Sequence, residues 1–280
     1  VVDQSRVDAE ISESFCHVAH SRYCQRTAKP RSLGVPRLEP RWCAYARNMV
    51  DHLESIVDQA LGGRPGHWTF AVAGPSGPAT IVGDPSRSYR LASVTKPLAA
   101  AATWLAIEEG TVSLDDPAGP EGSTLGHLLA HASGLPFEGR DAIAAPGTRR
   151  IYSNTGFEVA AEHLAAASGL SMATYLHEGV CAPLDMASTH LDASPAWGAT
   201  STVADLIRFG QELLAPTVFD PTTIDRVTSV AFAGLDGVLP GYGRQTPNPW
   251  GLGVEVRGNK SPHWTGTTAA PGTSSRRPRS

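Results

Sequence analysis

The segment around Pro97 constrains the fold of this chain more than any other. The run from Leu98 to Ile107 is rich in alanine and leucine and is apolar nearly all round, which is typical of a buried helix. Proline is tolerated only in the first turn of a helix, so Pro97 requires this helix to begin close to Ser93. Because the preceding run Tyr89-Arg90-Leu91-Ala92 is strand-like, the sequence predicts a strand-to-helix junction at Ser93.

Ser93 and Lys96 stand at this junction, three residues apart, so their side chains lie one above the other on a helix face. Burial disfavours the charged form of a lysine, and a neutral Lys96 can take the proton of Ser93 and make it a nucleophile. The positive end of the helix dipole favours an alkoxide at the same place. The structural alternative is that Ser93 caps the helix and Lys96 extends to solvent.

A second candidate motif is Tyr152-Ser153-Asn154, which precedes a predicted helix. A tyrosine and an asparagine two residues apart in an extended loop point the same way. A phenol beside a cation can shuttle a proton to a leaving group, and the amide could hold both a substrate carbonyl and the lysine. The alternative is that serine and asparagine serve only as helix caps.

Together these motifs resemble the serine β-lactamase and penicillin-binding-protein superfamily, most closely its class C branch with the related esterases and D-aminopeptidases. The segments 128–136 and 199–206 also resemble that family, and the likeness covers about residues 46–266. It implies that Ser93 is the nucleophile, Lys96 its base and Tyr152 the proton shuttle. Asn154 would help to bind substrate, and the backbone N–H of Ser93 would form half of an oxyanion hole.

The third motif of that branch is a Lys-Thr-Gly-like strand, and its best candidate here is Trp264-Thr265-Gly266. On this reading Thr265 and Gly266 bind substrate. The esterase branch is known for replacing the lysine, so Trp264 favours ester over β-lactam chemistry. On the second reading these residues are loop and the third motif is absent, since some relatives place a His-x-Gly motif slightly later.

Composition divides the chain into three parts. Residues 1–45 are polar and aperiodic and are expected to form an irregular or disordered leader, followed by a hydrolase domain over 46–266 and a disordered tail over 267–280. The abrupt change after Thr268 motivates the hypothesis that the C-terminus is truncated or frame-shifted and the domain incomplete. Strands near 67–73 and 79–83 would then lack partners.

The leader contains side chains that commonly bind zinc, namely Cys16, His17, His20, Cys24 and Cys43. Their spacing fits no common zinc finger, so we predict no metal site, and nothing in the chain calls for a cofactor. Cys181 is expected to be a buried apolar filler. His131 and His163 lie in helical contexts, where a lone histidine is more often structural than catalytic.

The predicted class is α+β, an α/β/α sandwich of the β-lactamase/transpeptidase type, with an α-rich region inserted between strands of an antiparallel sheet. With 280 residues and 41% hydrophobic content the chain can bury the core of one main domain. Helices are predicted over about 45–61, 93–110, 125–131, 157–168, 172–179, 203–214 and 221–229, with a strand over 251–256.

Several classes of protein are disfavoured. The net charge of −4 gives no reason to expect nucleic acid, and no run approaches the roughly 18 apolar residues of a membrane span. No signal peptide is visible, so we expect a cytoplasmic protein; the oligomeric state is not indicated. The motifs of α/β-hydrolases, zinc metalloproteases and phosphate-binding loops are missing.

These observations predict a serine hydrolase that forms an acyl-enzyme with a small-molecule ester or amide. A β-lactamase, a penicillin-binding protein or a D-aminopeptidase is the alternative within the family, with a β-lactam or peptide as substrate. A catalytically impaired, non-enzymatic homologue is the alternative from another class.

Overall fold

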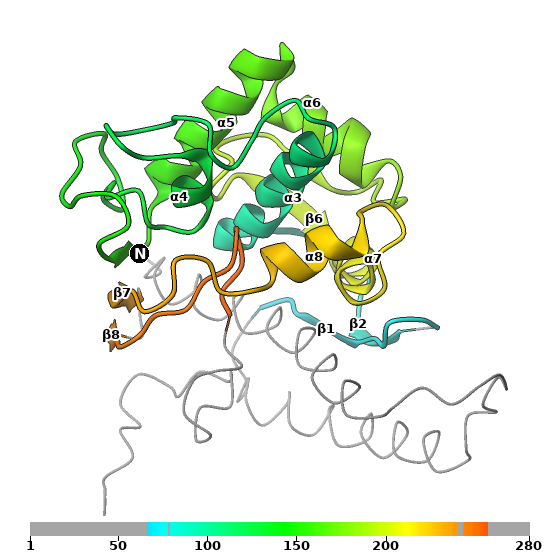
Figure 1. Ribbon diagram of the computed structural model, residues 1–280. Helices are drawn as coiled ribbons and strands as arrows, with labels where there is room; N and C mark the ends of the chain where they lie inside the picture. Colours follow the sequence, from blue (N-terminus) through cyan, green and yellow to red (C-terminus); the bar gives the residue numbers. More distant parts are fainter. Residues whose placement is uncertain (1–65, 78, 240–242, 257–280) are drawn as a thin grey trace, which may run out of the picture.

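The computed structural model describes residues 66–77, 79–239 and 243–256 (Figure 1). Its helical elements are η2 (Ala92–Val94), α3 (Thr95–Glu108), α4 (Leu125–Leu129), α5 (Asn154–Ser168), α6 (Met172–Leu176), η3 (His177–Cys181), α7 (Val203–Leu214) and α8 (Pro221–Val227). Its strands are β1 (Thr69–Val72), β2 (Thr80–Gly83), β3 (Ser88–Arg90), β4 (Arg150–Ile151), β5 (His190–Leu191), β6 (Ala199–Thr202), β7 (Gly237–Leu239) and β8 (Gly243–Gln245). Mixed helices and mainly antiparallel strands confirm the predicted α+β class.

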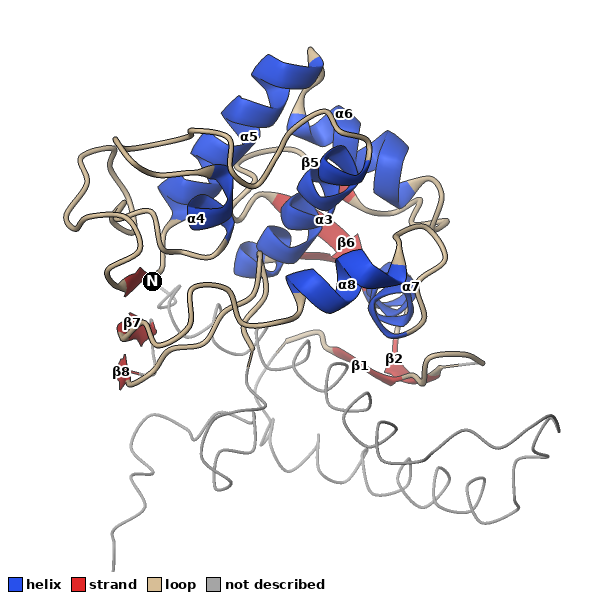
Figure 2. Cartoon of the chain, viewed as in Figure 1, coloured by secondary structure: helices blue, strands red, loops and turns tan. Residues whose placement is uncertain are grey.

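The strands of the described chain form three small sheets (Figure 2). In one, β6 lies between β3 and β5, and both neighbours run antiparallel to it. In another, β7 pairs with β4 in parallel and with β8 antiparallel. The third is the hairpin of β1 and β2, in which Thr69 pairs with Gly83. The expectation that these two strands lack partners is therefore wrong, because they pair with each other.

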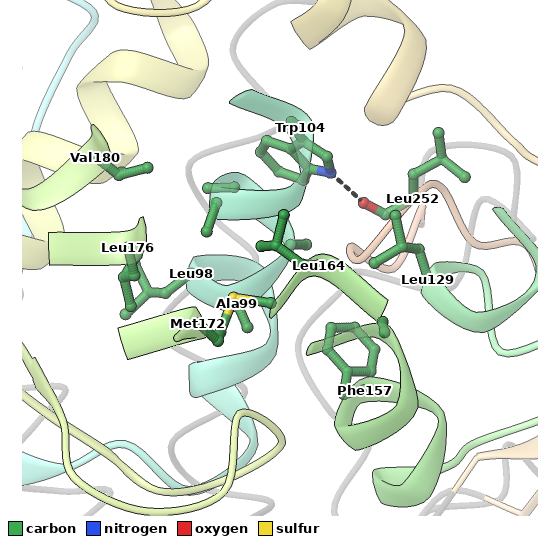
Figure 3. Packing of buried hydrophobic residues seen from close by; sticks show 14 of the residues in the cluster. Leu98, Ala99, Trp104, Leu129, Phe157, Leu164, Met172, Leu176, Val180 and Leu252 are labelled. Atoms are coloured by element: carbon green, nitrogen blue, oxygen red, sulfur yellow. Dashed lines mark hydrogen bonds between the residues drawn. The ribbon is translucent and has the colours of Figure 1, made fainter. Parts of the chain in front are cut away.

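Helix α3 is the centre of the core. Its residues from Leu98 to Ala102 are almost completely buried, as is Trp104, and the helix packs against α5, α6 and α8. Leu98 lies beside Leu176 of α6, while the Trp104 indole donates a 2.8 Å hydrogen bond to the Leu252 carbonyl (Figure 3). The all-round apolar pattern is thus satisfied because other elements surround this helix.

The helix starts follow local capping chemistry. Ser153 caps α5 by accepting a 2.9 Å hydrogen bond from the Gly156 N–H, and Thr202 caps α7 by accepting from Asp205. Each cap satisfies a backbone donor that the helix leaves unpaired. For α7 the predicted bounds are the observed ones, whereas α5 begins three residues earlier than predicted.

One sequence prediction is wrong, and another falls outside the described residues. The strand predicted over 251–256 is wrong: the segment is a tight turn in which the Gly251 N–H donates to the Val254 carbonyl at 2.8 Å. Gly253 has φ of +99°, which glycine adopts without a steric penalty, and this breaks the alternation that resembled a strand. The helix predicted over 45–61 lies outside the described residues.

The remaining helix predictions differ mainly at their ends. Helix α6 ends at Leu176 and the chain continues as the π-helical turn η3, in which Cys181 is buried as predicted. Burial raises the pKa of the Cys181 thiol to about 12. Across the residues that the structure describes, no helix combines the length and the hydrophobicity needed to cross a membrane.

Candidate active site

Ser93 lies in the turn η2, directly before α3, where it is half-buried. Its neighbour Ala92 has φ of +46°, a left-handed conformation that is uncommon for a residue other than glycine. The helix cap of α3 is Val94, and no side chain makes a capping hydrogen bond there, so Ser93 is not the helix cap of the structural alternative. Its hydroxyl is instead 3.4 Å from the amine Nζ of Lys96.

Lys96 is buried, with 2% of its surface exposed, and so does not extend to solvent. Besides Ser93, its Nζ donates hydrogen bonds to the Asn154 Oδ1 at 2.7 Å and to the Ala196 carbonyl at 2.9 Å. These partners come from the start of α5 and from the loop between β5 and β6. The structure therefore joins three segments of the chain at one amine.

Tyr152 lies on another side of the same amine, with its ring centroid 4.5 Å from the Lys96 Nζ. The Ser153 hydroxyl caps α5, which leaves Asn154, the first residue of that helix, to bind the lysine. The backbone N–H of Asn154 also donates to the Phe137 carbonyl at 2.9 Å. Capping and lysine binding thus belong to different residues, because Ser153 is the helix cap whereas Asn154 binds the lysine and does not cap the helix.

The partners of Lys96 match the needs of a proton acceptor. A neutral amine has two N–H donors and one lone pair. The amide oxygen of Asn154 and the carbonyl of Ala196 are pure acceptors and can take both donors, which leaves the lone pair for the hydroxyl proton of Ser93. A charged Lys96 could donate to all three oxygens. The same surroundings therefore suit both the neutral amine and the ammonium group that forms when Lys96 accepts a proton.

The Ala196 carbonyl is a site group that the sequence did not indicate. Ala196 is fully buried and carries no reactive side chain, so no motif identifies it. The adjoining β6 is positioned partly by the buried Thr95, whose hydroxyl accepts a 3.0 Å hydrogen bond from the Ala199 N–H. Thr95, which lies between the two motif residues, thereby ties this part of the chain to the start of α3.

A second buried cation, Arg150, lies two residues before Tyr152. Only 1% of its surface is exposed, and its guanidinium donates to the carbonyls of Ala130, Ala231, Phe232 and Asn248. Burial lowers the pKa of Arg150 to about 10, so the group remains charged at neutral pH. No sequence motif indicates this role of Arg150, because the backbone carbonyls that surround it come from distant segments and have no sequence signature.

Some predicted site residues lie outside the described residues. These are Thr265 and Gly266, with Trp264 of the same motif, and also the cysteines and histidines considered for zinc within residues 1–45. Within the described ranges no cluster of three or more metal-binding side chains occurs. Two surface hollows of about 340 and 380 Å³ have neither Ser93 nor Lys96 in their linings, so neither hollow contains this pair.

Comparison with known proteins identifies the family. A family model described as Beta-lactamase matches residues 84–277, more than half of the chain. The crystal structure of a β-lactamase from Mycobacterium bovis is 52% identical, with a TM-score of 0.70 over 76% of this chain and 80% of that one.

Curated relatives match over shorter stretches. The D-alanyl-D-alanine-carboxypeptidase/endopeptidase AmpH of Escherichia coli strain K12 is 29% identical over 38% of this chain and 37% of that protein. Penicillin-binding protein 4* of Bacillus subtilis strain 168 is 29% identical over 37% of this chain and 30% of that protein. The match spans about a third of the length of these two relatives. The family match, the fold and the Ser93–Lys96 geometry agree, and the chain belongs to the β-lactamase family of serine hydrolases.

Proposed function

We propose that this serine hydrolase acts through an acyl-enzyme on Ser93, with small esters as its first substrate class. The observation that carries the proposal is the hydrogen-bond set of Lys96, which joins a buried amine to the Ser93 hydroxyl and to two pure acceptors. Such an arrangement supports general-base activation of a serine.

In the proposed first step, the Lys96 Nζ takes the proton of Ser93 while Oγ bonds to the carbonyl carbon of the substrate. The carbonyl electron pair moves to oxygen, and the Ser93 N–H supplies one donor to the resulting oxyanion. When the tetrahedral intermediate collapses, the bond to the leaving group breaks. Tyr152 gives its proton to the leaving oxygen and recovers one from Lys96.

Water completes the reaction. It attacks the acyl carbonyl, loses its proton to the base of the site and displaces Ser93 Oγ, which is reprotonated. An acid is released, and the enzyme returns to its starting state with all protons accounted for.

A β-lactam or a D-amino-acid peptide is the second candidate substrate class. The similar proteins favour it, since they include a β-lactamase, a D-alanyl-D-alanine-carboxypeptidase and a penicillin-binding protein. The preference for esters depends instead on Trp264, which lies outside the described residues. The two classes use the same nucleophile and differ in the leaving group.

Intact-mass measurement tests the proposal directly. Purified protein is incubated with a fluorophosphonate and, separately, with a penicillin, alongside a Ser93→Ala variant. We expect one adduct per chain in the native protein and none in the variant, and the preferred reagent separates ester from β-lactam chemistry. Absence of any adduct on protein that circular dichroism shows to be folded would favour the non-enzymatic homologue.

A further inference from the structure

His131 holds the chain on both sides of Tyr152. Its backbone carbonyl accepts a 2.8 Å hydrogen bond from the N–H of Ile151, and its ring nitrogen Nδ1 accepts one of 3.1 Å from the N–H of Ser153. The His131 ring also contacts the tyrosine ring, with 4.6 Å between centroids. One residue thus fixes the backbone before and after Tyr152 as well as one face of its side chain.

The conformation of His131 is set by its surroundings. It follows α4 with φ of +56° and is 1% exposed, between the rings of Phe157 and Trp250 at 5.4 and 4.7 Å. A left-handed histidine carries a backbone cost, which persists only where neighbouring contacts outweigh it. These contacts make the ring part of a rigid wall behind Tyr152.

The hydrogen bond to Ser153 requires the neutral ring. Because Nδ1 accepts, the ring proton must be on Nε2, and protonation of Nδ1 would set two donors against each other. Among the described residues, the charged or titratable groups that face this ring are Lys96 from α3, Arg150 from β4 and the phenol of Tyr152. Burial, and then the charges of Lys96 and Arg150, hold the pKa of His131 well below its usual 6.5.

We propose that His131 is a positioning residue for Tyr152, keeping the phenol beside Lys96 so that it can protonate the leaving group. The inference rests on the proposed role of Tyr152 in the acyl-enzyme mechanism. Many buried histidines in proteins only fill space. His131 differs from them because it makes hydrogen bonds to the two residues that flank Tyr152.

Leaving-group dependence is the readout that a purely structural role would not change. An ethyl ester needs its leaving oxygen protonated, whereas a 4-nitrophenyl ester of the same acid does not. His131→Phe keeps a ring but loses the acceptor, and it is expected to slow ethyl ester hydrolysis roughly 10- to 100-fold, with a much smaller effect on the nitrophenyl ester. Tyr152→Phe should show the same pattern.

His131→Asn is the conservative variant. Its amide oxygen takes the place of Nδ1, and asparagine tolerates the left-handed backbone, so both ester rates should stay within about threefold of the native values. His177→Phe, at an exposed position in η3, is the matched control for loss of a histidine. Folding of each variant is checked by circular dichroism.

The outcomes separate this inference from the proposed function. A native protein that hydrolyses neither ester and forms no Ser93 adduct counts against the proposed function. An active native protein whose His131→Phe variant loses both rates equally, or neither, overturns the positioning role alone. If His131→Phe does not fold, His131→Gln replaces it in the same comparison, because its amide reaches the position of Nε2 and not that of Nδ1.

Discussion

Lys96 and Arg150 are both buried cations, yet their hydrogen-bond partners differ. Lys96 donates to one side-chain amide and one carbonyl and keeps its third direction for the hydroxyl of Ser93. Arg150 is enclosed by four backbone carbonyls, and all four of these hydrogen-bond partners are chemically unreactive.

The hydrogen-bond partners of a buried cation thus indicate whether its role is chemical or structural. An amine can give up a proton, and its lone pair can then receive one from a neighbour. A guanidinium remains protonated and has five donors in a fixed plane, which suits it to joining several chain segments. We therefore expect Lys96 to control reaction rate and Arg150 to control stability.

Replacing Lys96 by methionine should produce the largest effect of all. Methionine is also unbranched and only one atom shorter, but it cannot accept a proton, so acylation of Ser93 should slow by about 10²- to 10⁴-fold, the usual contribution of a general base. The measurement is the rate of adduct formation by intact mass, with the melting temperature taken in parallel. A variant that reacts at the native rate would show that Lys96 is not the base.

Replacing Arg150 by methionine should instead reduce the free energy of unfolding, by about 3 kcal/mol, because several buried carbonyls lose their donor. Adduct formation per folded molecule should change much less than in the lysine variant. Urea unfolding followed by circular dichroism measures the loss, and Arg150→Lys, which keeps a charge but not the planar fork, is the control. If the methionine variant has the same free energy of unfolding as the native protein, Arg150 does not have the structural role proposed for it.

Acid should destabilise the protein through His131, whose pKa is lowered by burial and by the charges of both cations. In the folded state its pKa is lowered, so the unfolded chain binds the additional proton as the pH falls below about 6.5. Stability from this residue is therefore present above that pH and declines below it, by at most about 1.4 kcal/mol per pH unit. Unfolding free energies measured between about pH 7 and 5 should fall more steeply for the native protein than for His131→Asn; equal slopes would contradict this.

The smallest effect is expected at the β1–β2 hairpin, which is less buried than either cation. Its strands are only half-buried, and the Gln211 amide of α7 donates to the exposed carbonyls of Gly74 and Gly77. Gln211→Ala should change the unfolding free energy by less than about 0.5 kcal/mol, as surface substitutions usually do. A larger loss in the same urea experiment would mean that the hairpin supports the core through α7.

Local signals in the sequence predicted the framework of the site. Pro97 and the apolar run after it predicted the buried helix that follows Ser93, and the bounds of α7 were predicted to the residue. The spacing of Ser93 and Lys96 and the Tyr152–Asn154 motif supplied the residues that meet at the amine. These predictions succeed because helix periodicity, capping and proline chemistry depend on neighbours within about one turn of the chain.

The helical framework, the family resemblance and the choice of Ser93 and Lys96 as the proposed reactive pair therefore follow from the sequence. The tertiary structure alone decided that the Ala196 carbonyl completes the lysine site and that four carbonyls enclose Arg150. It also decided that His131 holds both sides of Tyr152. The physical reason is that every residue carries the same backbone carbonyl and N–H, so which of them face a buried side chain is set only when distant segments pack together.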